Sequence, residues 1–91
     1  MDKKDIIIKY MLRNGFSFMM AETAYLITIG LTYEEIGKLY NVTPKAITSR
    51  MRNIYEVFLL RSRAELTAHL FDVVLNVVIK KGLSKEAPKG V

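Results

Sequence analysis

Two signals for the start of a helix lie close together in the middle of the chain, and they restrict its fold more than any other feature. Thr32-Tyr33-Glu34-Glu35 matches a capping box, in which the Thr hydroxyl and the second Glu carboxylate each satisfy a free backbone N–H. Thr43-Pro44 gives a second start, because proline loses no hydrogen bond at the first helical position. Asn41 suits the left-handed position of a turn. The sequence therefore predicts two short helices joined by Asn41-Val42-Thr43.

Helical periodicity continues on both sides of this pair. Residues 2–13 and 17–29 each suit a helix that a glycine-containing turn closes, and Ser62-Arg63-Ala64-Glu65 is a second capping box. The last helix should end near Lys81-Gly82. Its valine pairs would also suit a strand, but its polar residues repeat at helical steps along one exposed stripe: Glu65, His69, Asp72, Asn76 and Lys80. We therefore predict a single all-α domain.

The helix that begins after Thr43 has two different faces. Ile47, Met51, Ile54 and Phe58 follow at steps of 4, 3 and 4, which predicts a stripe that faces the core. The other face carries the polar side chains Lys45, Thr48, Ser49 and Arg52. A helix-turn-helix motif places its second helix in the major groove of DNA, and such a role explains a short, polar and cationic face.

The position of the positive charge agrees with this interpretation. The chain of 91 residues has a net charge of +5, and residues 43–63 hold five basic side chains against one acidic side chain. Residues 1–42 are neutral in sum, and residues 64–91 carry a net +1. A patch of this kind attracts polyanions. The alternative is a basic surface that is merely solvated.

Composition excludes several other classes of protein. There is no cysteine and only one histidine, so neither a disulfide framework nor a cysteine–histidine metal site is expected. We find no nucleophile–base pair and no glycine-rich phosphate loop, and we predict a protein that is not an enzyme and needs no cofactor or metal. The longest apolar region, residues 70–79, contains Asp72 and Asn76 and is too short to span a bilayer. We expect a cytoplasmic protein without a membrane partner.

Residues 30–66, GLTYEEIGKLYNVTPKAITSRMRNIYEVFLLRSRAEL, resemble the DNA-binding domain of LuxR-type regulators, which also occurs in free-standing GerE-like proteins. The pieces in register are Gly30-Leu31-Thr32, Glu35-Ile36-Gly37, Val42-Thr43, Ala46-Ile47-Thr48, Asn53-Ile54 and Ser62-Arg63. The resemblance implies a four-helix helix-turn-helix domain over residues 16–82, with a recognition helix at about 44–58. Residues 1–15 would be a helical extension, and residues 83–91 a disordered tail.

The chain departs from the family pattern at several positions. Met20 replaces an acidic residue, and Val57-Phe58-Leu59 replaces the usual Lys-Leu-Gly at the end of the recognition helix. Thr48 and Arg50 stand where Lys and His are common. Gly37 stands where the family usually has Ala, and we expect the two motif helices to approach closely there, with room for one methyl group.

The resemblance and the polar face together assign DNA contacts. The base-reading positions fall on Thr48, Ser49 and Arg52, of which Arg52 suits bidentate recognition of guanine. Phosphate contacts fall on Thr43, Lys45 and Arg50. Arg61 and Arg63 are either further phosphate contacts or simply flank the cap at Ser62.

The final helix carries more apolar surface than a small domain can use. Its first stripe should cover the core, and it consists of Leu66, Leu70, Val73 and Val77. Its second stripe, Phe71, Val74 and Val78, has no obvious partner within the chain. A homodimer would bury the second stripe. The alternative is that residues 2–13 fold back over it.

These features predict a sequence-specific, duplex-DNA-binding transcription regulator that acts as a homodimer, without the receiver or ligand-binding domain that usually precedes this module. Two alternatives remain. One is a protein-interaction module, such as a truncated regulator that pairs with a full-length partner and inhibits it. The other is a protein that resembles sigma-factor domain 4 and contacts RNA polymerase.

Overall fold

The structure is all-helical over the part of the chain that it describes. The computed structural model describes the backbone of residues 2–86 and the side chains of residues 2–80. Residues 2–86 contain no strand and form the helices α1 (Lys3–Arg13), α2 (Phe18–Thr28), α3 (Tyr33–Tyr40), α4 (Pro44–Phe58) and α5 (Arg63–Glu86). The valine pairs of residues 73–78 are helical. The prediction of an all-α fold is therefore confirmed.

Side-chain caps fix where four of these helices begin. Asp2, Ser17, Thr32 and Thr43 each accept a hydrogen bond from the backbone N–H three residues further along the chain. The capping box at Thr32 is complete, because the Glu35 carboxylate also accepts from the Thr32 N–H at 2.8 Å. These bonds satisfy donors that have no partner inside the helix.

The second capping box differs from its prediction. Ser62 accepts from the Glu65 N–H at 3.2 Å, as expected. The Glu65 carboxylate, however, accepts from the N–H of Arg61 at 3.1 Å, one residue before the cap. The reciprocal bond therefore ties down the turn between α4 and α5 as well as the start of α5.

The last helix is longer than predicted. We expected it to end near Gly82 and residues 83–91 to be disordered, whereas α5 continues to Glu86. One glycine within a helix costs only about 1 kcal/mol relative to alanine, and no proline lies between Arg63 and Pro88. The prediction is thus wrong for residues 83–86, and residues 87–91 lie outside the described part.

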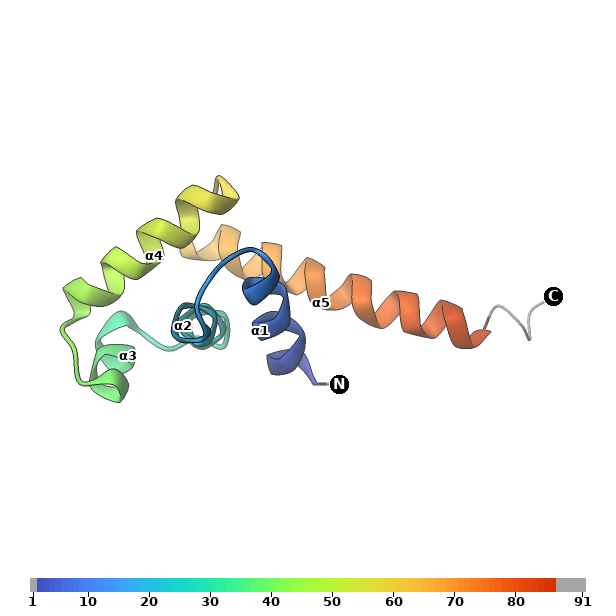
Figure 1. The fold of residues 1–91 in the computed structure, drawn as a ribbon, viewed down its shortest axis with the longest axis horizontal. Coiled ribbons are helices and arrows are strands. Elements are labelled where there is room, and N and C mark those ends of the chain that lie inside the picture. Colours follow the sequence, from blue (N-terminus) through green and yellow to red (C-terminus); the bar gives the residue numbers. More distant parts are fainter. Residues whose placement is uncertain (1, 87–91) are drawn as a thin grey trace.

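Helix α2 lies at the centre of the molecule and contacts each of the other four helices (Figure 1). Helix α1 packs against α2 and α5. Its side chains Ile7, Ile8 and Met11 belong to the same buried cluster as the core residues of α2, α3, α4 and α5. The segment that the sequence set apart as an extension therefore shares one core with the rest of the chain.

The contact of α1 with α5 has a polar centre. The Tyr10 hydroxyl and His69 Nε2 lie 2.8 Å apart, and the Phe58 ring packs against both rings, with centroids 5.7 and 4.8 Å away. His69 is half-buried. We predicted that His69 would lie on an exposed polar stripe, and this prediction is wrong because α1 and the end of α4 cover that part of α5.

The C-terminal half of α5 extends beyond the other helices (Figure 1). The molecule measures 55 × 25 × 21 Å along its principal axes, and the long dimension follows this helix. Within the described residues, no helix combines the length and the apolar character needed to cross a membrane.

Candidate nucleic-acid interface

Helix α4 presents its polar face to solvent because its apolar face is fixed in the core. Ile47, Met51 and Ile54 are fully buried. The turn of residues 41–43 joins α4 to α3, and Asn41 adopts the left-handed conformation with a φ of 57°. Burial of one side leaves Thr48, Ser49 and Arg52 exposed on the other side. The structure thus brings the three predicted base-reading residues onto one accessible face.

Most side chains of this face are free to contact a partner. Over residues 2–80, Lys45, Ser49 and Arg52 make no side-chain hydrogen bond and no ion pair. Thr48 donates its hydroxyl hydrogen to the Pro44 carbonyl at 3.2 Å and keeps its lone pairs available. Thr43 accepts the cap bond and lies at the exposed start of the helix.

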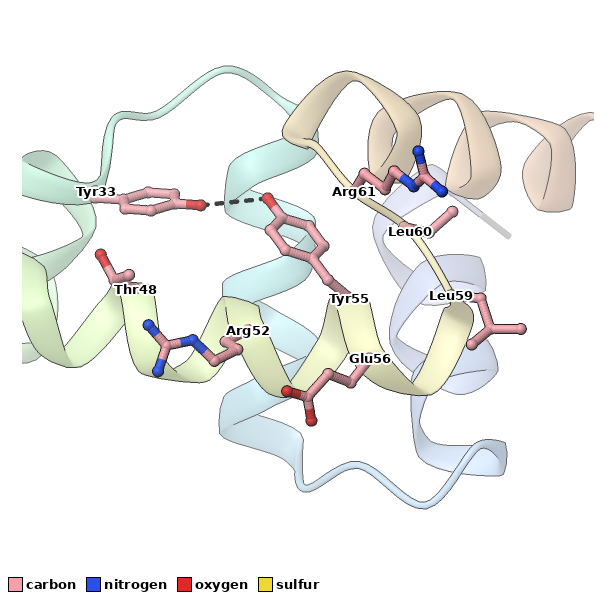
Figure 2. Close-up of a pocket in the computed structure, with 8 residues that line it drawn as sticks. All are labelled: Tyr33, Thr48, Arg52, Tyr55, Glu56, Leu59, Leu60 and Arg61. Carbon is pink, nitrogen blue, oxygen red and sulfur yellow. Dashed lines mark hydrogen bonds between the residues drawn. The ribbon is translucent and has the colours of Figure 1, made fainter.

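A hollow of about 630 Å³ adjoins this face (Figure 2). It is lined by Thr48, Arg52, Tyr55 and Glu56 of α4, by Tyr33 of α3, and by residues 59–61 of the following turn. Thr48 and Arg52 lie at one end of the hollow, and Arg61 lies at the other end. Three residues with predicted DNA contacts therefore share one concave surface.

Two tyrosines close one side of this hollow. The hydroxyls of Tyr33 and Tyr55 lie 3.2 Å apart and face each other (Figure 2). Burial, followed by the hydrogen bond with Tyr33, raises the pKa of the Tyr55 hydroxyl above its ordinary value. The Tyr55 phenol therefore stays neutral at physiological pH, and the pair of tyrosines braces α4 against the start of α3.

Arg50 faces the interior of the molecule instead. Its guanidinium lies over the Tyr40 ring, 4.9 Å from the centroid, and donates to the Thr23 hydroxyl at 3.4 Å. Tyr40 in turn donates to the Glu22 carboxylate. Burial is the main cause, and this hydrogen bond the second cause, that raises the pKa of Tyr40 to about 12. Arg50 thus links α4 to α2 and α3.

Of the two arginines near the start of α5, one is bound within the molecule and the other is exposed. Arg63 donates from Nη2 to the backbone carbonyls of Ile27 and Leu31, which lie at the end of α2 and in the loop after it. The Ile27 carbonyl also accepts the Gly30 N–H at 3.1 Å, so Arg63 adds a second bond at the end of α2 and ties the following loop to the start of α5. The Arg61 side chain is exposed and lines the hollow.

Gly37 allows the turn between α3 and α4 to lie close to α3. A Cβ atom at this position would lie 2.7 Å from the Val42 carbonyl oxygen and 3.4 Å from backbone atoms of Thr43 and Pro44. The predicted close approach is confirmed. The predicted space for a methyl group is wrong, because the Val42 N–H donates to the Gly37 carbonyl at 2.8 Å and holds the turn in place.

The apolar residues of α5 are divided between the core and the exposed surface differently from the prediction. Leu66 and Leu70 are fully buried, as expected. Of the predicted interface residues, Val74 is half-buried against the core, whereas Phe71 is 53% and Val78 56% exposed. Leu75, which was not among the predicted interface residues, is 45% exposed and lies between them.

The exposed side of α5 follows a heptad pattern. Ala64, Ala68, Phe71, Leu75 and Val78 follow at steps of 4, 3, 4 and 3, and all are exposed. We call this set the α5 seam. Alternating steps of 4 and 3 are typical of a coiled-coil contact. The spacing was visible in the sequence, but only the structure separates it from the neighbouring stripe that packs on the core.

Comparison with protein-family models, curated proteins and solved structures finds no match to this chain.

Proposed function

We propose that this protein is a duplex-DNA-binding transcription regulator of the LuxR/GerE type, with α4 as its recognition helix. The observation that supports this most is the exposed face of α4, where Lys45, Ser49 and Arg52 form no side-chain hydrogen bond or ion pair with any of residues 2–80. This face directly follows a short turn between two helices. A rigid helix with free cationic and hydroxyl groups suits the major groove.

Within this proposal the side chains of α4 have different tasks. Arg52 reads a guanine through its two parallel N–H donors, and Thr48 and Ser49 contact neighbouring base edges with weaker discrimination. Lys45 and the hydroxyl of Thr43 lie at the start of α4 and contact phosphates. Arg61, at the far end of the hollow, contacts a phosphate further along the same strand.

We leave two of the candidates from the sequence out of the proposed phosphate contacts. Arg50 and Arg63 were candidates from the sequence, but each donates hydrogen bonds to α2 or to the loop after it. Movement of either side chain toward DNA would break these bonds, and movement of Arg50 would also end its contact with the Tyr40 ring, which costs free energy. We therefore assign phosphate contact to Lys45, Thr43 and Arg61 and a structural role to Arg50 and Arg63.

The proposal includes a homodimer that forms through the α5 seam. A second copy of α5 is a partner with the same heptad spacing, and a two-fold contact is the commonest way in which copies of one chain associate. Ala64, Ala68 and Phe71 line one shallow hollow, so a bulky side chain of the second copy has a place beside the small ones. Pairing would place two recognition helices on one duplex.

A second candidate function is a protein-interaction module. Leu59 is 88% exposed at the tip of the turn after α4, and it lines the same hollow as two tyrosines and two arginines. Tyrosine and arginine are frequent at the centres of protein interfaces. A transcription factor or an RNA polymerase subunit could dock there, as the alternative that resembles sigma-factor domain 4 requires.

Fluorescence anisotropy with labelled random-sequence duplex DNA distinguishes these functions. Wild-type protein should bind, with an affinity that falls steeply as salt increases. The double variant Lys45→Ala/Arg52→Ala should bind far more weakly. Lys3→Ala/Lys4→Ala removes the same charge from α1 and serves as the matched control. Equal binding by the two double variants, or no binding by wild type, would exclude α4 as a DNA-recognition helix.

A further inference from the structure

A groove of about 400 Å³ lies between α1 and α5, away from the α4 face. Its apolar walls are Ile6 of α1 and Val73 and Val77 of α5. Ile6 is buried, and the two valines are half-buried, since α1 does not close fully over α5. Volumes of about 300–1,000 Å³ are usual for small-molecule sites.

The polar lining of this groove is positively charged. Lys9 and Arg13 both line it, one helical turn apart on α1, and both are exposed. Like charges at this spacing repel each other. Within residues 2–80 neither cation forms an ion pair, and no acidic side chain lines the groove. An anion between these two side chains would relieve the repulsion.

The remaining polar groups do not neutralise the cations. The Tyr10 hydroxyl is bonded to His69. The Asn76 amide donates to the Asp72 carboxylate at 3.4 Å, and Asp72 itself does not line the groove. The groove thus combines an apolar wall with an unmatched pair of cations along one edge, which is complementary to an amphipathic anion.

We propose that the groove between α1 and α5 binds an aliphatic carboxylate. The hydrocarbon chain lies against Ile6, Val73 and Val77, and the carboxylate lies between Lys9 and Arg13. Arginine can hold a carboxylate through two parallel hydrogen bonds, and lysine adds a mobile positive charge. The ligand bridges α1 and α5 and so stabilises the packing of α1. This site does not depend on DNA binding.

Nuclear magnetic resonance titration of the isotope-labelled full chain with decanoate, below its micelle concentration and without DNA, tests the proposal. Saturable shifts should occur at backbone amides of α1 and of α5 around residues 73–77. Lys9→Gln and Arg13→Gln should each weaken binding by about tenfold, because each removes one charge-assisted contact. Both side chains are exposed, so both variants should fold.

Three controls identify the chemistry. Decan-1-ol has the chain without the charge, acetate has the charge without the chain, and both should bind much more weakly than decanoate. Lys38→Gln removes a lysine from α3, outside the groove, and should leave decanoate binding unchanged. Equal binding of decanol and decanoate, shifts outside α1 and α5, or no saturable shift would each overturn the proposal.

Discussion

Gly37 has no side chain, and this allows the turn after α3 to pack directly against the helix. We predict that Gly37→Ala lowers the free energy of unfolding by about 1–3 kcal/mol, because its Cβ would lie 2.7 Å from the Val42 carbonyl oxygen. The gain in helix propensity, about 1 kcal/mol at most, offsets only part of this cost. Thermal unfolding followed by circular dichroism measures the change.

The control for this prediction is Leu39→Ala, at an exposed position of the same helix, and it should change the melting temperature little. If Gly37→Ala melted at or above the temperature of wild type, the turn would have to move more easily than its bond from the Val42 N–H to the Gly37 carbonyl suggests.

Leu59 is held in an unfavourable conformation by the turn after α4. Its φ of 58° lies in the left-handed region, which costs a residue with a side chain about 1–2 kcal/mol. Since Leu59 is 88% exposed, its side chain contributes little burial that could offset this cost. Leu59→Gly should therefore raise the free energy of unfolding by about 0.5–1 kcal/mol.

Chemical denaturation of Leu59→Gly and of Leu59→Ala tests the cause. Alanine removes the same side-chain contacts but keeps the strain, so only glycine should stabilise the protein. Equal stability of the two variants would show that backbone strain at this position is negligible.

At the scale of single residues, the sequence predicted whether a side chain faces the core or the solvent better than it predicted which group the side chain bonds. Helical spacing correctly placed Ile47, Met51 and Ile54 in the core and Ser49 and Arg52 outside. It could not predict that Arg50 reaches Thr23, 27 residues earlier in the chain, or that Arg63 reaches Leu31. A long side chain chooses among acceptors that only the tertiary structure brings near.

Helix α4 is the element on which the proposed function depends. Substitution of two of its residues should weaken DNA binding in different ways. Arg52→Ala should weaken binding to a selected site by about 1–3 kcal/mol and relax the preference at one base pair. Lys45→Ala should weaken binding to all DNA sequences by the same factor. It should also lower the slope of log affinity against log salt concentration by about one.

Binding titrations of both variants over a series of salt concentrations, on selected and on scrambled duplexes, measure these effects. If the two variants lost affinity and salt dependence in the same way, the division of α4 into base-reading and phosphate-contacting positions would be wrong.

At the scale of elements, local signals predicted where helices begin but not always where they end. The caps at Ser17, Thr32 and Thr43 are bonds between residues three apart, so the sequence alone was sufficient. Helix α5 ends beyond its predicted end because the local cost of Gly82 is too small to stop a continuous helix. The burial of His69 was missed because it depends on α1, a distant segment.

At the scale of the whole molecule, the α5 seam should hold two copies together. Leu75→Glu places a charge in the centre of the seam, so the variant should sediment as a folded monomer under conditions in which wild type is a dimer. Leu39→Glu, on the exposed surface of α3, is the matched control and should remain dimeric. A monomeric wild type at high micromolar concentration, or a dimeric Leu75→Glu, would exclude the seam.

The packing of α1 also belongs to this scale. The sequence left two possibilities for the apolar surplus of α5, a second copy or coverage by residues 2–13. In the structure Val74 is half-buried and, with Phe71, lines a hollow beside Lys3 and Ile7 of α1, whereas Phe71, Leu75 and Val78 all remain exposed. Periodicity could not divide the surplus, because neighbouring stripes differ by only a small rotation about the helix axis.

Selection of duplex DNA from a random-sequence library, followed by sequencing, tests the proposed function as a whole, because enrichment of a symmetric site requires both the α4 face and the dimer. We predict enrichment of a two-fold symmetric sequence whose half-sites lie about 10 base pairs apart, centre to centre, and contain a guanine that Arg52→Ala no longer selects. A library that stays unenriched after repeated rounds with folded wild-type protein would contradict the account.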